Sequence, residues 1–364
     1  MLGLVAVLVI TAILRIGAVV RIDDPQQVPR SHAEGDAPTY YVLAENLIDG
    51  IGYRYSADTL PTARRTPGYP LLLAAIFKVF GRDFNAVRGV QCVLDVLTAF
   101  LVFALATILL RNTGAALLAA LAYALYPPAI LSTTYIMTET AYTFLLVLFT
   151  LCCVVALRNS SYSLFAASGI LIGLATLTRP GVFLLPLVLL VVCIIAKPSS
   201  WRGMILLLIA FTITMLPWGL RNSRDMGKFI PTSTLMGANL YKGNHLPSQG
   251  SFFTSTDSLL TPQIRAEVAT VTEARRDSIL RTEAVRMILA NKKDVAWLML
   301  KKIPRLWFNL GYGRAPSRRS LALAGLHLVL IVLAVYGYLT IPPDRRFLGV
   351  VPITIIKVLS LIHI

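Results

Sequence analysis

Long apolar runs constrain this chain more than any other feature, because a helix of about 20 apolar residues crosses the 30 Å hydrocarbon layer of a membrane. Such runs lie near 2–20, 86–110, 114–131, 138–157, 163–177, 181–196, 204–220, 321–341 and 347–364. Only 14% of the 364 residues are charged, against about 25% in soluble domains. The sequence therefore predicts an all-α fold, a polytopic bundle of transmembrane helices.

The two ends of the chain carry expectations of their own. The first apolar run lacks a basic region before it and a small-x-small cleavage site, so we expect an uncleaved first span rather than a signal peptide. The last run continues to the end without a closing polar segment, and its final letters "LSLIHI" resemble translated sequencing adapter. We therefore expect a C-terminally truncated chain.

The charge pattern predicts the orientation. The formal net charge is +16, from 34 Lys and Arg against 18 Asp and Glu. No polar basic domain with interleaved aromatics stands out, which argues against nucleic-acid binding. Basic residues gather in alternate short loops, which the positive-inside rule places in the cytoplasm: Arg111, Arg158, Lys197 with Arg202, and Arg345 with Arg346. The remaining loops then lie on the exofacial side.

The expected organisation has three parts. Residues 1–220 form a transmembrane core, whose first exofacial loop (21–85) contains an amphipathic helix at 37–49 and an interfacial segment at 67–81. Residues 221–320 form an exofacial region, with a polar helical stretch near 261–293 followed by a juxtamembrane helix rich in Trp and basic residues. Residues 321–364 hold the C-terminal spans.

Metal chemistry is not indicated by the residues. The four cysteines (Cys92, Cys152, Cys153 and Cys193) lie inside apolar runs without metal-ligand spacing, and the four histidines are scattered. We predict no metal site and no cofactor.

Two carboxylates are the leading catalytic candidates, since ionisable groups near membrane depth are costly to keep there. Asp36 lies in "GDAP" before the predicted helix 37–49, and Glu139 lies in "YIMTETAYTF" at the exofacial end of a span. The alternative for Asp36 is an N-cap, and for Glu139 a helix-dipole contact. Glu34 is a weaker partner in an exposed loop. Asp95, inside a span, is expected to have a structural partner.

Basic residues on the same predicted side could bind an anion, because the planar guanidinium fork fits phosphate oxygens. The candidates for binding a donor phosphate are Arg64, Arg65, Arg179, Arg221, Lys301, Lys302 and Arg305. For each of them alone, snorkelling to lipid headgroups is the alternative. Arg15, inside the first span, either snorkels outward or pairs with an acid of the first loop.

Other polar residues are candidates for sugar or acceptor contacts. The segment "STLMGANLYKGNH" (233–245) offers amides suited to sugar hydroxyls, although an ordinary surface turn is the alternative. The candidates are Tyr40, Tyr69, Asn239, Lys242 and Asn244.

An ordered series of motifs resembles a known family. It comprises "GDAPTYYVLAENLIDGIGY", "RRTPGYPLLLA", "MTETAYTFLL", "LATLTRPGVFLLP" and "LPWGLRNSRDMGKFIPTSTLMGANLYKGN". Together these segments, over roughly residues 1–310, are similar to the dolichyl-phosphate-mannose–protein mannosyltransferase-like family of GT-C membrane glycosyltransferases, with the lipid A aminoarabinose transferases as relatives. Family members usually have more spans than the nine counted here.

The resemblance implies an activity. It implies an inverting glycosyltransferase that moves a hexosyl or pentosyl group from a polyprenyl-phosphate donor to a lipid, glycan or protein acceptor on the exofacial side. Asp36 occupies the place of the family's catalytic acid. Protein mannosyltransferases often have Asp-Glu there, whereas this chain has Asp36-Ala37, which points to the bacterial branch and to the inner membrane with a periplasmic site. Related oligosaccharyltransferases use a divalent ion, so a metal stays open.

Two other classes remain as alternatives. A transporter or flippase of a lipid-linked or anionic substrate tends to have charged residues deep in several spans and internal repeats, whereas the spans here are mostly free of charge. A non-catalytic scaffold would not require acids and arginines gathered on one side of the membrane.

Overall fold

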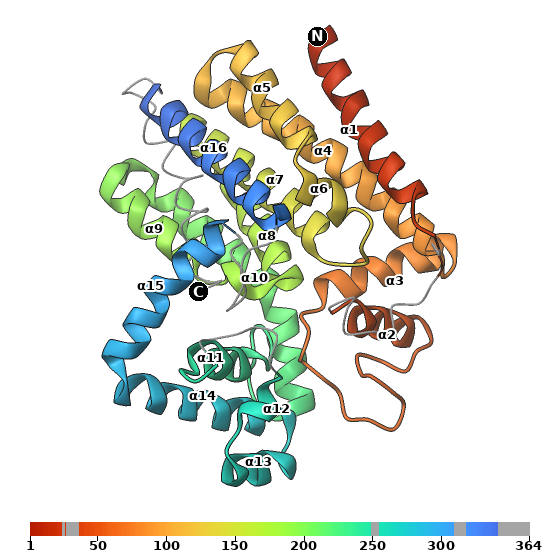
Figure 1. Cartoon of the computed structure of the whole chain (residues 1–364), viewed down its shortest axis with the longest axis vertical. Coiled ribbons are helices and arrows are strands. Elements are labelled where there is room, and N and C mark those ends of the chain that lie inside the picture. Colours follow the sequence, from red (N-terminus) through yellow and green to blue (C-terminus); the bar gives the residue numbers. More distant parts are fainter. Residues whose placement is uncertain (24–25, 27–35, 249–254, 309–317, 341–364) are drawn as a thin grey trace.

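The computed structural model describes residues 1–23, 26, 36–248, 255–308 and 318–340, and in these ranges its regular secondary structure is helical, with no strand (Figure 1). Four described helices are long and apolar enough to cross a membrane. They are α1 (Leu2–Val20), α4 (Phe84–Leu110), α7 (Glu139–Asn159) and α10 (Trp201–Met226), the last preceded by the short η3 (Pro198–Ser200). The prediction of an all-α membrane protein is confirmed.

Shorter apolar helices complete the bundle. They are α3 (Gly68–Phe80), α5 (Thr113–Ala124), α8 (Tyr162–Thr178), α9 (Leu185–Ala196) after the short η2 (Pro180–Val182), and α16 (Arg318–Thr340). The expected last span at 347–364 and the Arg345–Arg346 loop lie outside the described residues.

One predicted span is divided in two. The apolar run at 114–131 forms α5 and a separate short helix, α6 (Pro127–Ser132). Pro127 and Pro128 lack the backbone N–H that a continuous helix would need. Proline is tolerated at a helix start, so a new helix begins there.

The main core packs α7, α8, α9 and α10 together, around buried side chains such as Phe149, Phe165 and Leu207. Gly169 of α8 allows the closest approach, since a Cβ there would lie 2.2 Å from the backbone oxygen of Leu207 on α10. The two helices can therefore pack backbone to backbone, as small residues permit in membrane bundles.

A second group of helices lies at one end of the bundle, below it in Figure 1. It comprises α2 (Ala37–Ile48), α11 (Met236–Asn244), α12 (Thr256–Leu259), α13 (Pro262–Ala269), α14 (Glu273–Ala290) and α15 (Lys292–Phe308). Helix α2 agrees with the predicted helix at 37–49, and positive φ angles of 73° at Gly50 and 92° at Gly52 end it. Helices α11 to α14 share a small core of their own.

The charged loops separate between the two ends of the bundle. At the opposite end, Lys197 Nζ donates to the backbone oxygen of Leu157, so the loops after α7 and after α9 lie together. At the α2 end, Thr66 Oγ1 donates to the Thr178 oxygen at 3.3 Å, which joins the start of α3 to the end of α8. The loops after α7 and after α9 therefore lie at one end of the bundle, and the start of α3 lies at the other.

Arg15 and Asp95 form a buried ion pair between α1 and α4. Arg15 Nε lies 2.6 Å from Asp95 Oδ2, and both side chains are at most 1% exposed. Arg15 also donates to the backbone oxygens of Tyr123 and Ala124 at the end of α5, and the Tyr123 hydroxyl donates to Asp95. The expected partner of Asp95 is confirmed. The prediction that Arg15 snorkels or pairs with a first-loop acid is wrong, because a full set of acceptors lies within the bundle.

Candidate functional site

Asp36 and Arg65 form the first ion pair of the candidate site. Asp36 immediately precedes α2, and its carboxylate accepts a hydrogen bond from Nη2 of Arg65. Asp36 stands at the N-cap position, but its backbone is in the α region and its side chain makes no cap hydrogen bond. The carboxylate therefore faces the arginine rather than serving the helix.

Arg65 is itself held in place by α2. Its Nε donates to Thr39 Oγ1 at 3.1 Å, and its guanidinium lies 5.4 Å from the ring centroid of Tyr40. In the described part of the chain, Nη1 of Arg65 makes no hydrogen bond. One edge of the guanidinium fork is thus left for a further acceptor.

Glu139 and Arg179 form the second pair. Glu139 begins α7 and Arg179 ends α8, and Arg179 Nη1 lies 3.0 Å from Glu139 Oε1. The other carboxylate oxygen, Oε2, is buried and has no hydrogen-bond partner among the described residues, and the same holds for the hydroxyls of Tyr142 and Tyr55. Buried polar atoms are nearly always hydrogen-bonded in folded proteins. These three atoms are therefore available to hydrogen-bond a bound molecule.

Tyr40 is affected by the charges of both ion pairs. Burial raises the pKa of Tyr40 to about 12, and the charges that act on its hydroxyl come from both pairs, Arg65 with Asp36 and Arg179 with Glu139. Tyr40 packs edge-on against Tyr69 with ring centroids 5.3 Å apart. The two carboxylates predicted from the sequence therefore share one neighbourhood, built from α2, the loop before α3, α7 and α8.

Tyr69 has a supporting position. It is 1% exposed, and its hydroxyl donates to Gln91 Oε1 of α4 at 2.9 Å. A Cβ on the preceding residue, Gly68, would lie 2.8 Å from the backbone of Leu177 and Thr178. The start of α3 is therefore fixed tightly against the end of α8, and Tyr69 packs against Tyr40 from this fixed position.

The guanidinium of Arg221 is used in contacts within the protein, two of them with the loop between α2 and α3. Its Nη1 donates to the Thr62 oxygen at 2.7 Å, its Nη2 donates to the Tyr53 oxygen at 3.1 Å, and its Nε pairs with Asp225 at 2.8 Å. The guanidinium also lies over the rings of Tyr53 and Trp218. These contacts favour a loop-holding role, and the predicted phosphate contact stays a prediction.

The remaining predicted cations are spread more widely. Arg64 is exposed beside Arg65, and its charge acts on the Tyr55 hydroxyl, whose pKa is raised by burial. Lys301 lies over the Trp297 ring at 5.6 Å, and Lys302 is buried with its Nζ donating to the Gly243 oxygen. The side chain of Arg305 lies outside the described part of the structure.

Helix α11 brings one more cation near Asp36. Burial lowers the pKa of Lys242, while the charge of Asp36 acts on it in the opposite direction. Asn244 is buried and donates to the Leu240 oxygen at 2.9 Å, whereas Asn239 is exposed. Lys242 is therefore within electrostatic range of Asp36.

Sequence reasoning missed several residues of this site. Three of them contact Arg65 or the loop that carries it: Thr39, Tyr53 and Glu273. Two more, Tyr55 and Tyr142, supply the buried hydroxyls that have no hydrogen-bond partner among the described residues. The one available signal was that Thr39 follows Asp36 by three residues and Tyr142 follows Glu139 by three, which is helical spacing toward one face. Glu273 had no such signal.

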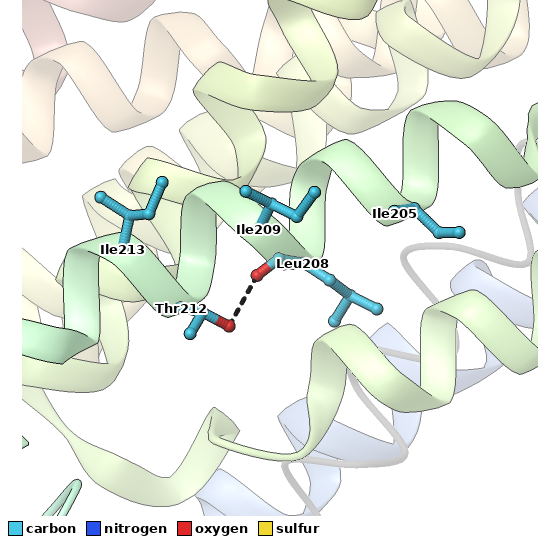
Figure 2. A pocket seen from close by; sticks show the side chains of 5 residues that line it. All are labelled: Ile205, Leu208, Ile209, Thr212 and Ile213. Carbon is cyan, nitrogen blue, oxygen red and sulfur yellow. Dashed lines mark hydrogen bonds between the residues drawn. The ribbon is translucent and has the colours of Figure 1, made fainter.

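No metal centre can be built from the described residues, among which no group of three or more His, Cys, Asp or Glu side chains is close enough to hold an ion. A shallow hollow of about 270 Å³ does exist, but on α10, lined by Ile205, Leu208, Ile209, Thr212 and Ile213 (Figure 2). Its one polar side chain, Thr212, donates back to the Leu208 oxygen at 2.9 Å. These residues lie in the half of α10 far from Arg221, so the hollow is separate from the candidate site.

The comparisons with known proteins are consistent with the motif pattern. Residues 64–218 match the model of the dolichyl-phosphate-mannose-protein mannosyltransferase family. No curated protein matches the chain. Among solved structures, ArnT from Cupriavidus metallidurans bound to undecaprenyl phosphate matches with a TM-score of 0.47 and 12% identity, over 98% of this chain and 76% of that one.

The matched segment includes Arg65, Glu139 and Arg179, whereas Asp36 precedes it. Three of the motifs also fall within the matched segment: "RRTPGYPLLLA", "MTETAYTFLL" and "LATLTRPGVFLLP". Over residues 64–218 the chain is therefore similar to the dolichyl-phosphate-mannose-protein mannosyltransferase family, as its motifs predicted.

Proposed function

We propose that this protein is an inverting glycosyltransferase that moves a sugar from a polyprenyl-phosphate donor to an acceptor on the exofacial side of the membrane. The observation that carries the proposal is the gathering of two carboxylate–arginine pairs, Asp36–Arg65 and Glu139–Arg179, around Tyr40 at one end of an apolar bundle. The family match over 64–218 supports the donor class. Basic loops at the opposite end support the exofacial assignment, since such loops stay in the cytoplasm, and we place the protein in a bacterial inner membrane.

Asp36 is the proposed general base. Its carboxylate accepts the proton of an acceptor hydroxyl or amine as the acceptor atom bonds to the anomeric carbon. The bond from that carbon to the phosphate oxygen breaks, and a polyprenyl phosphate anion leaves. A single displacement from the opposite face inverts the anomeric centre.

The leaving phosphate needs positive charge, because an anion develops as the bond breaks. Arg65 has an unused Nη1 edge beside Asp36, and Arg64 is exposed next to it. A donor phosphate that accepts a hydrogen bond from Arg65 would also weaken the ion pair between Arg65 and Asp36. The Asp36 carboxylate would then accept a proton more readily.

The site also contains polar atoms, unpaired among the described residues, that could hydrogen-bond to the sugar. Glu139 Oε2 accepts hydrogen bonds, and the hydroxyls of Tyr55 and Tyr142 can donate or accept. A molecule with several hydroxyl groups satisfies such a set. The charges of the two ion pairs cancel, which fits a neutral sugar ring beside a charged phosphate.

The test compares Asp36→Asn with Asp49→Asn. Both residues lie at the ends of α2 and pair with an arginine, Asp49 with Arg82 at the exposed far end. Asparagine keeps the shape of Asp36 but accepts no proton, so kcat for sugar transfer should fall by about 10²- to 10⁴-fold. Asp49→Asn should keep wild-type activity. The measurement uses purified protein in nanodiscs with radiolabelled dolichyl-phosphate mannose, further polyprenyl-phosphate sugars and candidate acceptors.

Two results would overturn the proposal. Full activity of Asp36→Asn would remove Asp36 from the chemistry. Movement of the labelled donor across a vesicle membrane, without any transfer to an acceptor, would show the transporter class instead.

A further inference from the structure

The loop that carries Arg65 is fixed from both sides, and one of the residues that fix it lies far away in the sequence. We call residues 62–66, "TARRT", the arginine loop. Thr62 and Ala63 are 2% and 0% exposed, so their polar groups need partners inside the protein. The contacts that satisfy them come from α10, α14 and the segment before α11.

Glu273, the first residue of α14, makes two of these contacts and a third with Thr234. Its Oε2 accepts from Thr62 Oγ1 at 2.7 Å, and its Oε1 accepts from the Ala63 backbone N–H at 3.0 Å. The same Oε1 accepts from Thr234 Oγ1. An acid at a helix N-terminus is favoured by the macrodipole, so α14 presents this carboxylate at little cost.

The remaining backbone groups of the same two residues are also used. Thr234 N–H donates to the Ala63 oxygen at 3.1 Å, and Arg221 donates to the Thr62 oxygen at 2.7 Å. Farther along the loop, the Tyr53 hydroxyl lies 3.1 Å from the Arg65 and Thr66 oxygens. Both backbone hydrogen-bonding groups of Ala63 are therefore paired, and the first residues of the arginine loop are fixed in position.

We propose that Glu273 is a positioning residue for sugar transfer: it fixes the arginine loop so that the guanidinium of Arg65 is held between Asp36 and the donor phosphate. This inference rests on the proposed function, since it names a residue that acts through Arg65. It also gives the region after α10 a role, because Glu273 fastens α14, and with it α11 and Lys242, to the first loop.

The design of the variants follows from the contacts. In Glu273→Gln the side-chain oxygen still accepts from Ala63 and Thr234, and the amide nitrogen donates to Thr62 Oγ1. In Glu273→Ala all three contacts are lost. The matched control is Asp277→Ala, which removes another carboxylate one turn along α14; Asp277 accepts from Gly237 N–H at 2.6 Å and makes no contact with the arginine loop.

The expected result separates positioning from general destabilisation. Glu273→Ala should lower kcat by about 10- to 100-fold, because a displacement of about 1 Å at a reacting group has effects of that size. Glu273→Gln should keep kcat and donor KM near the wild-type values. Asp277→Ala should lower the melting temperature while leaving kcat near wild type.

Three results would overturn the inference: unchanged kcat in Glu273→Ala, an equal loss in Glu273→Gln, or an equal loss in Asp277→Ala. The second would mean that the negative charge itself acts in the reaction, and the third that only the stability of α14 matters.

A second measurement does not depend on turnover. Amide hydrogen exchange of residues 62–66 should become faster in Glu273→Ala but not in Glu273→Gln, because the Ala63 N–H loses its acceptor in the first variant alone. If the wild-type protein transfers no sugar, the proposed function is wrong, and this exchange experiment still decides whether Glu273 fixes the loop. Unchanged exchange in Glu273→Ala would show that it does not.

Discussion

The carboxylate of Asp36 stands at a helix N-terminus but does not bond to the helix. Aspartate is a preferred N-cap because its side chain accepts from the first turn, and the sequence "GDAP" left capping and catalysis as equal alternatives. In the structure, the carboxylate accepts from Arg65 and makes no cap hydrogen bond. The interaction that this aspartate makes in the structure is therefore the ion pair with Arg65 rather than a cap.

Tyr40 provides a test of the site at the residue scale through its raised pKa of about 12. The unfolded value is near 10, so between these values the unfolded chain releases the tyrosine proton while the folded protein keeps it. The stabilisation is complete below pH 10 and is lost as the pH rises to 12, by about 1.4 kcal/mol per pH unit.

Tyr40→Phe removes this dependence while keeping the ring against Tyr69 and Arg65. We expect the melting temperature of the wild type to fall more steeply than that of the variant between pH 10 and 12, for a difference of about 2–3 kcal/mol. Thermal unfolding in detergent at a series of pH values measures it. Parallel curves for the two proteins would contradict the burial of the Tyr40 hydroxyl.

At the scale of elements, the Arg15–Asp95 pair joins α1 to α4 and reaches the end of α5. A buried charge left without its partner costs about 3–5 kcal/mol. Asp95→Leu and Arg15→Leu should each destabilise the protein by about that amount. The double variant should lose less than the sum of the two, because neither charge is then left alone.

Unfolding in mixed micelles with increasing sodium dodecyl sulfate gives these three free energies. A matched surface control is Arg286→Leu, whose pair with Glu283 is 70% exposed on the arginine side and should contribute little. Additive effects of the two core substitutions would mean that Arg15 and Asp95 do not interact in the folded membrane protein.

The elements themselves could largely be predicted from the sequence, because apolar length and loop charge directly reflect the membrane. The exceptions have local or distant causes. Pro127 and Pro128 broke one predicted span, which the positions of the prolines could have shown. The partner of Arg15 lies 80 residues away, and Thr62 and Ala63, two of the partners of Glu273, lie more than 200 residues from it; one sequence carries no record of such pairings. Asp36 and Glu139 became candidates because charges near a membrane are conspicuous, whereas Tyr55 and Tyr142 look like ordinary aromatic side chains of a membrane protein.

At the scale of the whole molecule, the two ends of the bundle should face different compartments. Ser56 lies in the exposed first loop near the candidate site, and Ser199 lies in η3 at the opposite end beside Lys197. Serine and cysteine differ by one atom, so Ser56→Cys and Ser199→Cys should fold normally. The native cysteines are buried or half-buried within helices.

A membrane-impermeant maleimide applied to intact spheroplasts should label Ser56→Cys and leave Ser199→Cys unlabelled until the membrane is permeabilised. The parent protein should stay unlabelled under both conditions. The reverse pattern would place the two ion pairs in the cytoplasm, and the orientation drawn from the basic loops would be wrong.

The buried pair of Arg15 and Asp95 also bears on how the chain enters the membrane during synthesis. An arginine at the centre of a span costs about 2.5–3.5 kcal/mol when it inserts alone, and Arg15 lies in the second half of α1. Its acid follows 80 residues later, which at a synthesis rate of 5–20 residues per second is a delay of roughly 4–16 s. During that interval the loop that becomes α2 and α3 must cross, while the first helix still lacks the partner for its charge. Until α4 is made, the apolar residues of the first span therefore have to offset the cost of Arg15 on their own.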